Sequence, residues 1–129
     1  MNRRANAAAA IVREEWGTLT WLAAGRLGNS QAMTLGLVTI QPGHANPRHA
    51  HFQCEEVLHL LRGSLHHTLG DEAVDLAAGD TLTIPAGVFH NATSTGAESA
   101  EMVVAYPTAV RDMVIEPPFV PEDDPSTYE

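Results

Sequence analysis

The chain has 129 residues, of which 44% are hydrophobic, and it carries a formal net charge of -9 at pH 7. This length predicts a single domain with a hydrophobic core of its own, and the acidic balance excludes the basic surface that binds nucleic acid or an anionic membrane. All seven basic residues are arginine, which excludes a lysine Schiff base, and the lone cysteine, Cys54, excludes an intramolecular disulfide. We therefore expect a reducing, cytoplasmic location.

Residues 1–16 are predicted to form an N-terminal arm or a short helix. An alanine run from Ala7 to Ala10 follows two arginines, but the apolar stretch ends at Val12 and charged residues follow it without a convincing signal-peptide cleavage site. No apolar run approaches the roughly 20 residues that are needed to cross a bilayer. We expect neither a membrane nor a nucleic-acid partner.

Residues 17–115 alternate between short β-type runs and turns, which predicts one barrel domain. Glycine, proline, asparagine and aspartate occupy the gaps, as in Gly28-Asn29-Ser30 and Pro85-Ala86-Gly87. Many short strands at regular spacing are typical of an all-β sandwich or barrel. The expected strands cover residues 18–22, 34–40, 48–51, 56–61, 65–69, 73–76, 81–84, 90–94 and 101–106.

The last segment, residues 116–129, is acidic and rich in proline. Proline does not donate a backbone hydrogen bond to a sheet, and a strongly charged segment buries little surface. We therefore predict an extended tail or strap outside the barrel.

Four residues in the predicted strands have side chains that bind transition metals. His49 and His51 are two residues apart, so on a strand both imidazoles face the same way. Glu56 follows after an expected turn, and His90 comes from a distant strand. Three neutral imidazoles and one carboxylate suit a divalent ion such as Zn, Fe, Mn, Ni or Cu, and they leave coordination positions open for chemistry.

Two adjacent glutamates are candidates for the carboxylate ligand. Glu55 and Glu56 are adjacent and face opposite ways on a strand, so only one of them reaches the interior. We favour Glu56, because its spacing to Gly63 is the better one. A lone His-x-His would be weak evidence for a metal site, since surface strands carry histidines freely; the whole set of spaced residues is much stronger.

The same residues resemble the cupin family. Residues 43–63 match the first cupin motif at Gly43, His49, His51, Glu56 and Gly63. The second motif is matched at four positions and departs from the pattern at the last, where Ser94 replaces asparagine; the matched positions are Gly79, Pro85, Gly87 and His90. The resemblance implies an RmlC-like jelly roll (a double-stranded β-helix), a metal in the barrel mouth held by His49, His51, Glu56 and His90, and a homodimer.

Other residues with reactive side chains are assigned lesser roles. His67 shares its strand face with Leu65 and Leu69, so we expect it inside, either as a base or substrate contact or as a hydrogen-bonded interior histidine. Arg48 is expected to form a surface ion pair with Glu55 or a neighbour. Cys54 is expected to be a small packed residue, because no partner base is evident.

Three functions remain open. We favour an enzyme in which the ion polarises a small oxygenated substrate, such as a carbonyl compound, sugar or carboxylic acid, with isomerase, lyase or cyclase chemistry and His67 or Glu56 as the base. An Fe-dependent dioxygenase is one alternative, and a non-catalytic small-ligand-binding or sensor module is the other. The fold does not name the reaction, because it hosts many unrelated chemistries.

Overall fold

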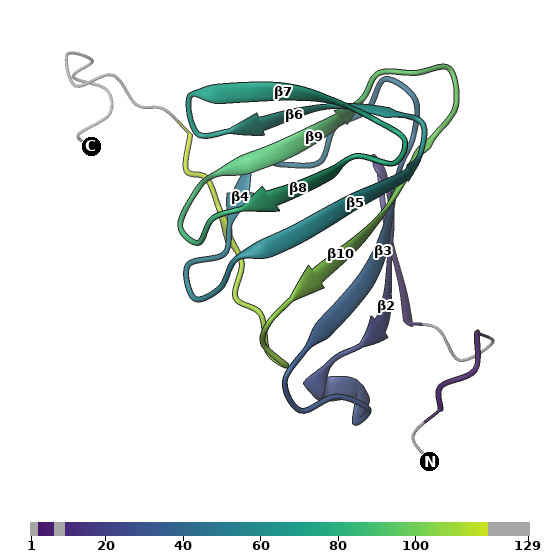
Figure 1. Ribbon diagram of the computed structural model, residues 1–129, viewed down its shortest axis with the longest axis vertical. Helices are drawn as coiled ribbons and strands as arrows, with labels where there is room; N and C mark the ends of the chain where they lie inside the picture. The colour runs from purple at the N-terminus through teal and green to yellow at the C-terminus, as the bar shows by residue number, and fades with distance from the viewer. Residues whose placement is uncertain (1–2, 7–9, 119–129) are drawn as a thin grey trace, which may run out of the picture.

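The computed structural model describes residues 3–6 and 10–118, and these form two antiparallel sheets (Figure 1). The first has six strands in the order β1-β2-β3-β10-β5-β8, and the second has five in the order β11-β4-β9-β6-β7. The strands are β1 (Ala10–Glu14), β2 (Gly17–Ala23), β3 (Thr34–Ile40), β4 (His49–Ala50), β5 (Glu56–Arg62), β6 (Ser64–Leu69), β7 (Glu72–Ala77), β8 (Thr81–Ile84), β9 (His90–Ser94), β10 (Ala100–Tyr106) and β11 (Val114–Ile115). A short 3-10 helix, Gly25–Leu27, follows β2.

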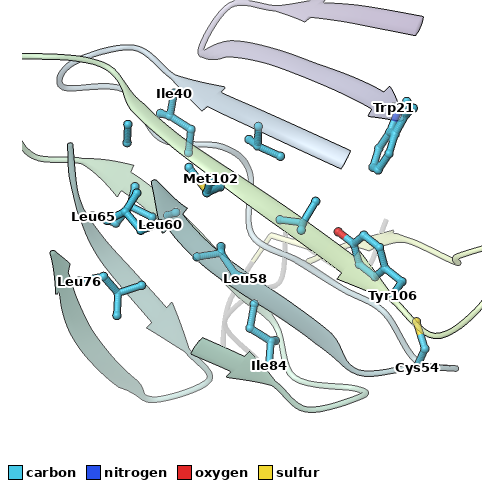
Figure 2. Close-up of a cluster of buried hydrophobic side chains, with 14 residues drawn as sticks. Trp21, Ile40, Cys54, Leu58, Leu60, Leu65, Leu76, Ile84, Met102 and Tyr106 are labelled. Atoms are coloured by element: carbon cyan, nitrogen blue, oxygen red, sulfur yellow. The ribbon is translucent and has the colours of Figure 1, made fainter. Parts of the chain in front are cut away.

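One hydrophobic core lies between the two sheets. Along β3 and β10 every second residue is buried, which is the pattern of strands with one face on a core. Both sheets contribute to the same buried cluster, and Figure 2 shows its larger side chains. Within the described part of the chain no strand pairing joins the two sheets, so this jelly roll is held as a sandwich by its core and not by a continuous ladder.

The all-β jelly-roll class is confirmed, and each strand expected between residues 18 and 106 is present. The prediction for the N-terminus is wrong over residues 10–14. These residues form β1, which pairs with β2 from Ala10↔Trp21 to Glu14↔Gly17. The short alanine-rich pattern favoured a helix locally, but the open edge of β2 provides hydrogen-bond partners for a strand.

The sequence also missed β11 near the C-terminus. Its two residues pair with β4, Val114 with Ala50 and Ile115 with His49. A two-residue strand carries no readable period, so only the ladder reveals it. Of the predicted acidic tail, residues 119–129 lie outside the described residues.

Gly63 shows why the turn between β5 and β6 needs glycine. Its φ is 77°, and a Cβ there would lie 2.9 Å from both the Cα of Ala100 and the carbonyl oxygen of Ser99. Both the left-handed conformation and the close backbone approach therefore exclude a side chain.

Among the described residues, no helix is long and apolar enough to cross a membrane.

Candidate metal centre

The four predicted ligands come from both sheets and meet at one site. His49 lies on β4 and is the direct cross-strand partner of His90, the first residue of β9. His51 follows β4 immediately, and Glu56 begins β5 in the other sheet. Glu56 is buried with Leu58 and Leu60 on the inner face of β5, whereas Glu55 is exposed.

The side-chain atoms of this cluster are close enough to share one ion. One ligand atom from each of the four residues lies within 4.8 Å of the others. Glu56 Oε1 is 3.2 Å from His51 Nε2 and 3.4 Å from His90 Nε2. The His49 and His90 ring centroids are 4.3 Å apart.

Backbone carbonyls determine which ring nitrogen faces the cluster. The Nδ1 atoms of His49, His51 and His90 lie 2.8, 2.6 and 2.9 Å from the carbonyl oxygens of Pro47, Asp112 and Val88. A carbonyl only accepts hydrogen bonds, so each Nδ1 carries the proton and donates it. In the neutral ring the lone pair is then on Nε2, which is the atom that binds metals in this arrangement.

The atoms that face one another in the cluster have no other partner in the described structure. His51 Nε2, His90 Nε2 and Glu56 Oε1 are buried and make no hydrogen bond. A buried polar atom without a partner costs about 1–3 kcal/mol. Two imidazole lone pairs and a carboxylate oxygen around one point are what a divalent cation would satisfy, so the residues fit a metal ion.

The pKa values of His49 and Glu56 are both shifted in the direction that metal binding needs. Burial lowers the pKa of His49 to about 4, which leaves its ring neutral near pH 7. Burial by itself would raise the pKa of Glu56, but the His51 and His90 rings beside the carboxylate outweigh burial and hold that pKa below its usual range. A neutral imidazole at His49 and an ionised carboxylate at Glu56 are the protonation states that metal ligands require.

A segment after β10 supports the site from outside. The carbonyl of Asp112 accepts the Nδ1–H of His51, and its carboxylate accepts the backbone N–H groups of Phe52 and Gln53 at 2.7 and 3.1 Å. Asp112 thereby holds the His51 ring and the loop after it. Nothing in the sequence pointed to this residue, because it lies 61 positions from His51 and forms no motif.

His67 faces the interior, as its strand pattern predicted. It is 1% exposed, and its ring stacks on that of His90 at a centroid distance of 5.7 Å and an interplanar angle of 11°. Its Nδ1 donates to the carbonyl of Thr68, so its Nε2 is free of that proton. Burial lowers the pKa of His67 to about 4.

The cluster opens into a pocket of about 590 Å³. His49, Glu56, His67 and His90 line one part of it. Apolar and aromatic side chains form most of the other walls, among them Trp16, Leu19, Trp21, Leu58, Met102, Val104 and Tyr106. Concave, mainly apolar pockets with a few convergent polar groups are typical of small-molecule sites.

Two predictions outside the cluster have mixed outcomes. Cys54 is buried and packs in the core, as expected (Figure 2). Arg48 does form an ion pair, but its partner is Glu116 at 2.6 Å and not Glu55. The pair joins the residue before β4 to the residue after β11, because the β4–β11 ladder brings these distant segments together.

Comparisons with known proteins agree with this geometry. The family model described as Cupin domain matches residues 36–106. The chain is 30% identical over 94 residues to germin-like protein 9-3 and 26% identical over 83 residues to germin-like protein 3-8, both of Oryza sativa subsp. japonica. These matches cover 69% and 60% of this chain and 44% and 37% of the relatives.

Solved structures of oxalate decarboxylases share the fold. The Lactobacillus farciminis enzyme, in a formate complex, matches with a TM-score of 0.77 at 19% identity, over 83% of this chain and 33% of that one. The S161A mutant of the Bacillus subtilis enzyme matches with a TM-score of 0.76 at 19% identity, over 82% of this chain and 29% of that one. The chain therefore spans about a third of these enzymes and less than half of the germin-like proteins. The family model matches more than half of the chain, and the four motif residues His49, His51, Glu56 and His90 lie together in the structure. The chain therefore belongs to the cupin family.

Proposed function

We propose that this protein binds one divalent transition metal ion through His49, His51, Glu56 and His90 and is an enzyme acting on a small oxygenated molecule. The observation that carries the proposal is the set of buried, unpartnered Nε2 and Oε1 atoms around one point at the end of a pocket. A purely structural polar cluster would satisfy its own hydrogen bonds. In this cluster, His51 Nε2, His90 Nε2 and Glu56 Oε1 have no hydrogen-bond partner among the described residues.

A bound Zn, Fe, Mn, Ni or Cu ion would supply a Lewis acid that stabilises negative charge developing on substrate oxygen. The chain's own residues have two further tasks. The apolar walls exclude water and thereby strengthen electrostatic interactions in the pocket. The Nε2 of His67 is unprotonated and lines the same pocket, so it is placed to accept a proton from the substrate.

The comparisons support a carboxylic acid or another small carbonyl compound as the substrate. Two similar solved structures are oxalate decarboxylases, one in a formate complex and one with Mn(II) centres. Their identity of 19% carries the fold alone, so the reaction type stays a proposal. The homodimer and the cytoplasmic location expected from the sequence are also proposals.

The first experiment is elemental analysis of protein purified without chelator, with Glu56→Gln and Glu55→Gln compared beside it. Both substitutions remove one carboxylate charge from adjacent positions. We expect near-stoichiometric metal in the parent protein and in Glu55→Gln, and loss of metal in Glu56→Gln. Absence of metal from all three after reconstitution would overturn the proposal.

The metal found decides which assay follows. Stoichiometric iron together with O2 uptake would favour the dioxygenase instead. Zinc, manganese or nickel without O2 uptake would support the isomerase, lyase or cyclase class, to be assayed on sugars, carbonyl compounds and carboxylic acids.

A further inference from the structure

Arg111 lies against two aromatic rings in the wall of the pocket. Its guanidinium carbon is 4.4 Å from the ring centroid of Trp21 and 5.5 Å from that of Tyr106. These rings come from β2 and β10 and lie at the same end of the core, as Figure 2 shows. Cation–π contacts of this kind hold a guanidinium in a defined place without using its N–H donors.

Those donors have no acceptor in residues 3–6 and 10–118, the part of the chain that the structure describes. Among the described residues, the Arg111 guanidinium forms neither a hydrogen bond nor an ion pair, whereas Arg48 is bound by both Glu116 and Thr68. Arg111 is half-buried and lines the pocket that also contains His49 and Glu56. A half-buried guanidinium with free donors in a mainly apolar pocket is well suited to bind an anionic ligand.

Neighbouring residues keep Arg111 in this position. Asp112, the next residue, is bound to the backbone N–H groups of Phe52 and Gln53. The Trp21 ring occupies space that a side chain at Gly36 would fill, since a Cβ at Gly36 would lie 2.8 Å from the ring. The Tyr106 ring in turn contacts the His51 ring at a centroid distance of 4.9 Å. The guanidinium is therefore preorganised beside the cluster.

We propose that Arg111 binds a carboxylate group of the substrate, so that this pocket selects small carboxylic acids. The inference rests on the proposed function, because it assigns the pocket's ligand class. A carboxylate matches the planar fork of a guanidinium and accepts two N–H bonds from it. The buried charge of Glu56 and the net charge of -9 would otherwise repel such an anion. Arg26, the other arginine in the pocket wall, is exposed to solvent.

The test is calorimetric titration with malonate, succinate and glutarate, each compared with its neutral diamide. The proteins are the parent, Arg111→Gln, Arg111→Lys and, as a charge-matched control outside the pocket, Arg62→Gln. Each is titrated both metal-loaded and after chelation. We expect at least one dicarboxylate to bind the parent about tenfold or more tightly than its diamide.

Arg111→Gln should abolish this preference, Arg111→Lys should retain only part of it, and Arg62→Gln should leave it unchanged. Circular dichroism shows whether each variant is folded, and Arg111→Lys keeps the charge if the glutamine variant does not fold. No preference for any dicarboxylate in the parent, or an equal preference in folded Arg111 variants, would overturn the proposal.

The experiment distinguishes failure of the proposed metal centre from failure of the proposed carboxylate site at Arg111. Metal content is measured on every sample before titration. Protein that takes up no metal would contradict the metal centre, while titration of the chelated samples would still decide the role of Arg111. Metal bound normally, with no effect of Arg111 substitution, would contradict only the carboxylate site.

Discussion

The hydrogen bonds on the far side of the three histidine rings determine what the cluster can bind. Each ring donates its Nδ1–H to a backbone carbonyl, so the orientation of Nε2 depends on main chain and not on another titratable group. Such outer partners fix the tautomer and the ring plane. The sequence therefore predicts the four ligand residues, but it does not predict the backbone carbonyls that orient the histidine rings.

Replacing Asp112 tests one of these outer partners. Asp112→Ala removes two acceptors from the loop after His51, so that the ring and its supporting carbonyl are held less firmly. Substitution of such partners typically lowers metal affinity about 10–100-fold. Competition with a chromophoric chelator measures the change. Asp75→Ala, which removes an exposed carboxylate paired with His66, should leave affinity unchanged; an equal loss in both variants would contradict this role.

The stability of the chelated protein should depend on pH through His67. Burial lowers its pKa from 6.5 to about 4, so between these values the unfolded chain binds a proton that the folded protein does not. Stability should therefore fall as pH falls through this window, by at most about 3 kcal/mol, and this component should level off below about pH 4. His67→Gln should give a shallower dependence in urea unfolding, and an unchanged slope would contradict the assignment.

Strands β5 and β9 each bring one ligand to the interior at their first residue. The alternation that buries Leu58 and Leu60 also turns Glu56 inward and Glu55 outward. The same alternation on β6 places His67 inside and His66 outside. A period of two is a local property, so these orientations were predictable from sequence.

The fit of Trp21 over β3 makes Gly36 sensitive to substitution. A Cβ at Gly36 would lie 2.8 Å from two atoms of the Trp21 ring. Gly36→Ala should displace that ring and destabilise the fold by about 1–3 kcal/mol, measured by urea unfolding. Trp21→Leu removes the obstruction, so the double variant should lose less stability than the sum of the two single variants. Strict additivity would show that the two residues do not compete for space.

The whole molecule creates the site, because its ligands come from both sheets. His49 and His90 belong to the five-stranded sheet and Glu56 to the six-stranded sheet. The cluster therefore forms only when the two sheets pack on their common core. An ion that binds this arrangement and not the unfolded chain must stabilise the fold.

Metal removal should therefore lower the melting temperature. At a free ion concentration one hundred times Kd, the bound ion adds about 3 kcal/mol of stability. Thermal unfolding before and after chelation measures this, and returning the ion should restore the difference. Glu56→Gln should unfold at the same temperature with and without chelator, and a shift in that variant would place the stabilising ion elsewhere.

The sequence by itself determined the strands between residues 18 and 106, their inward faces and the four residues of the cluster, because strand alternation and short motif spacings are local. Only the tertiary structure decided that Ala10–Glu14 is a strand, that Arg48 pairs with Glu116, and that residues 111 and 112 support the pocket. These contacts join segments far apart in the chain. They depend on which sheet edges are free and how the sheets pack, and neither property has a period or a motif in the sequence.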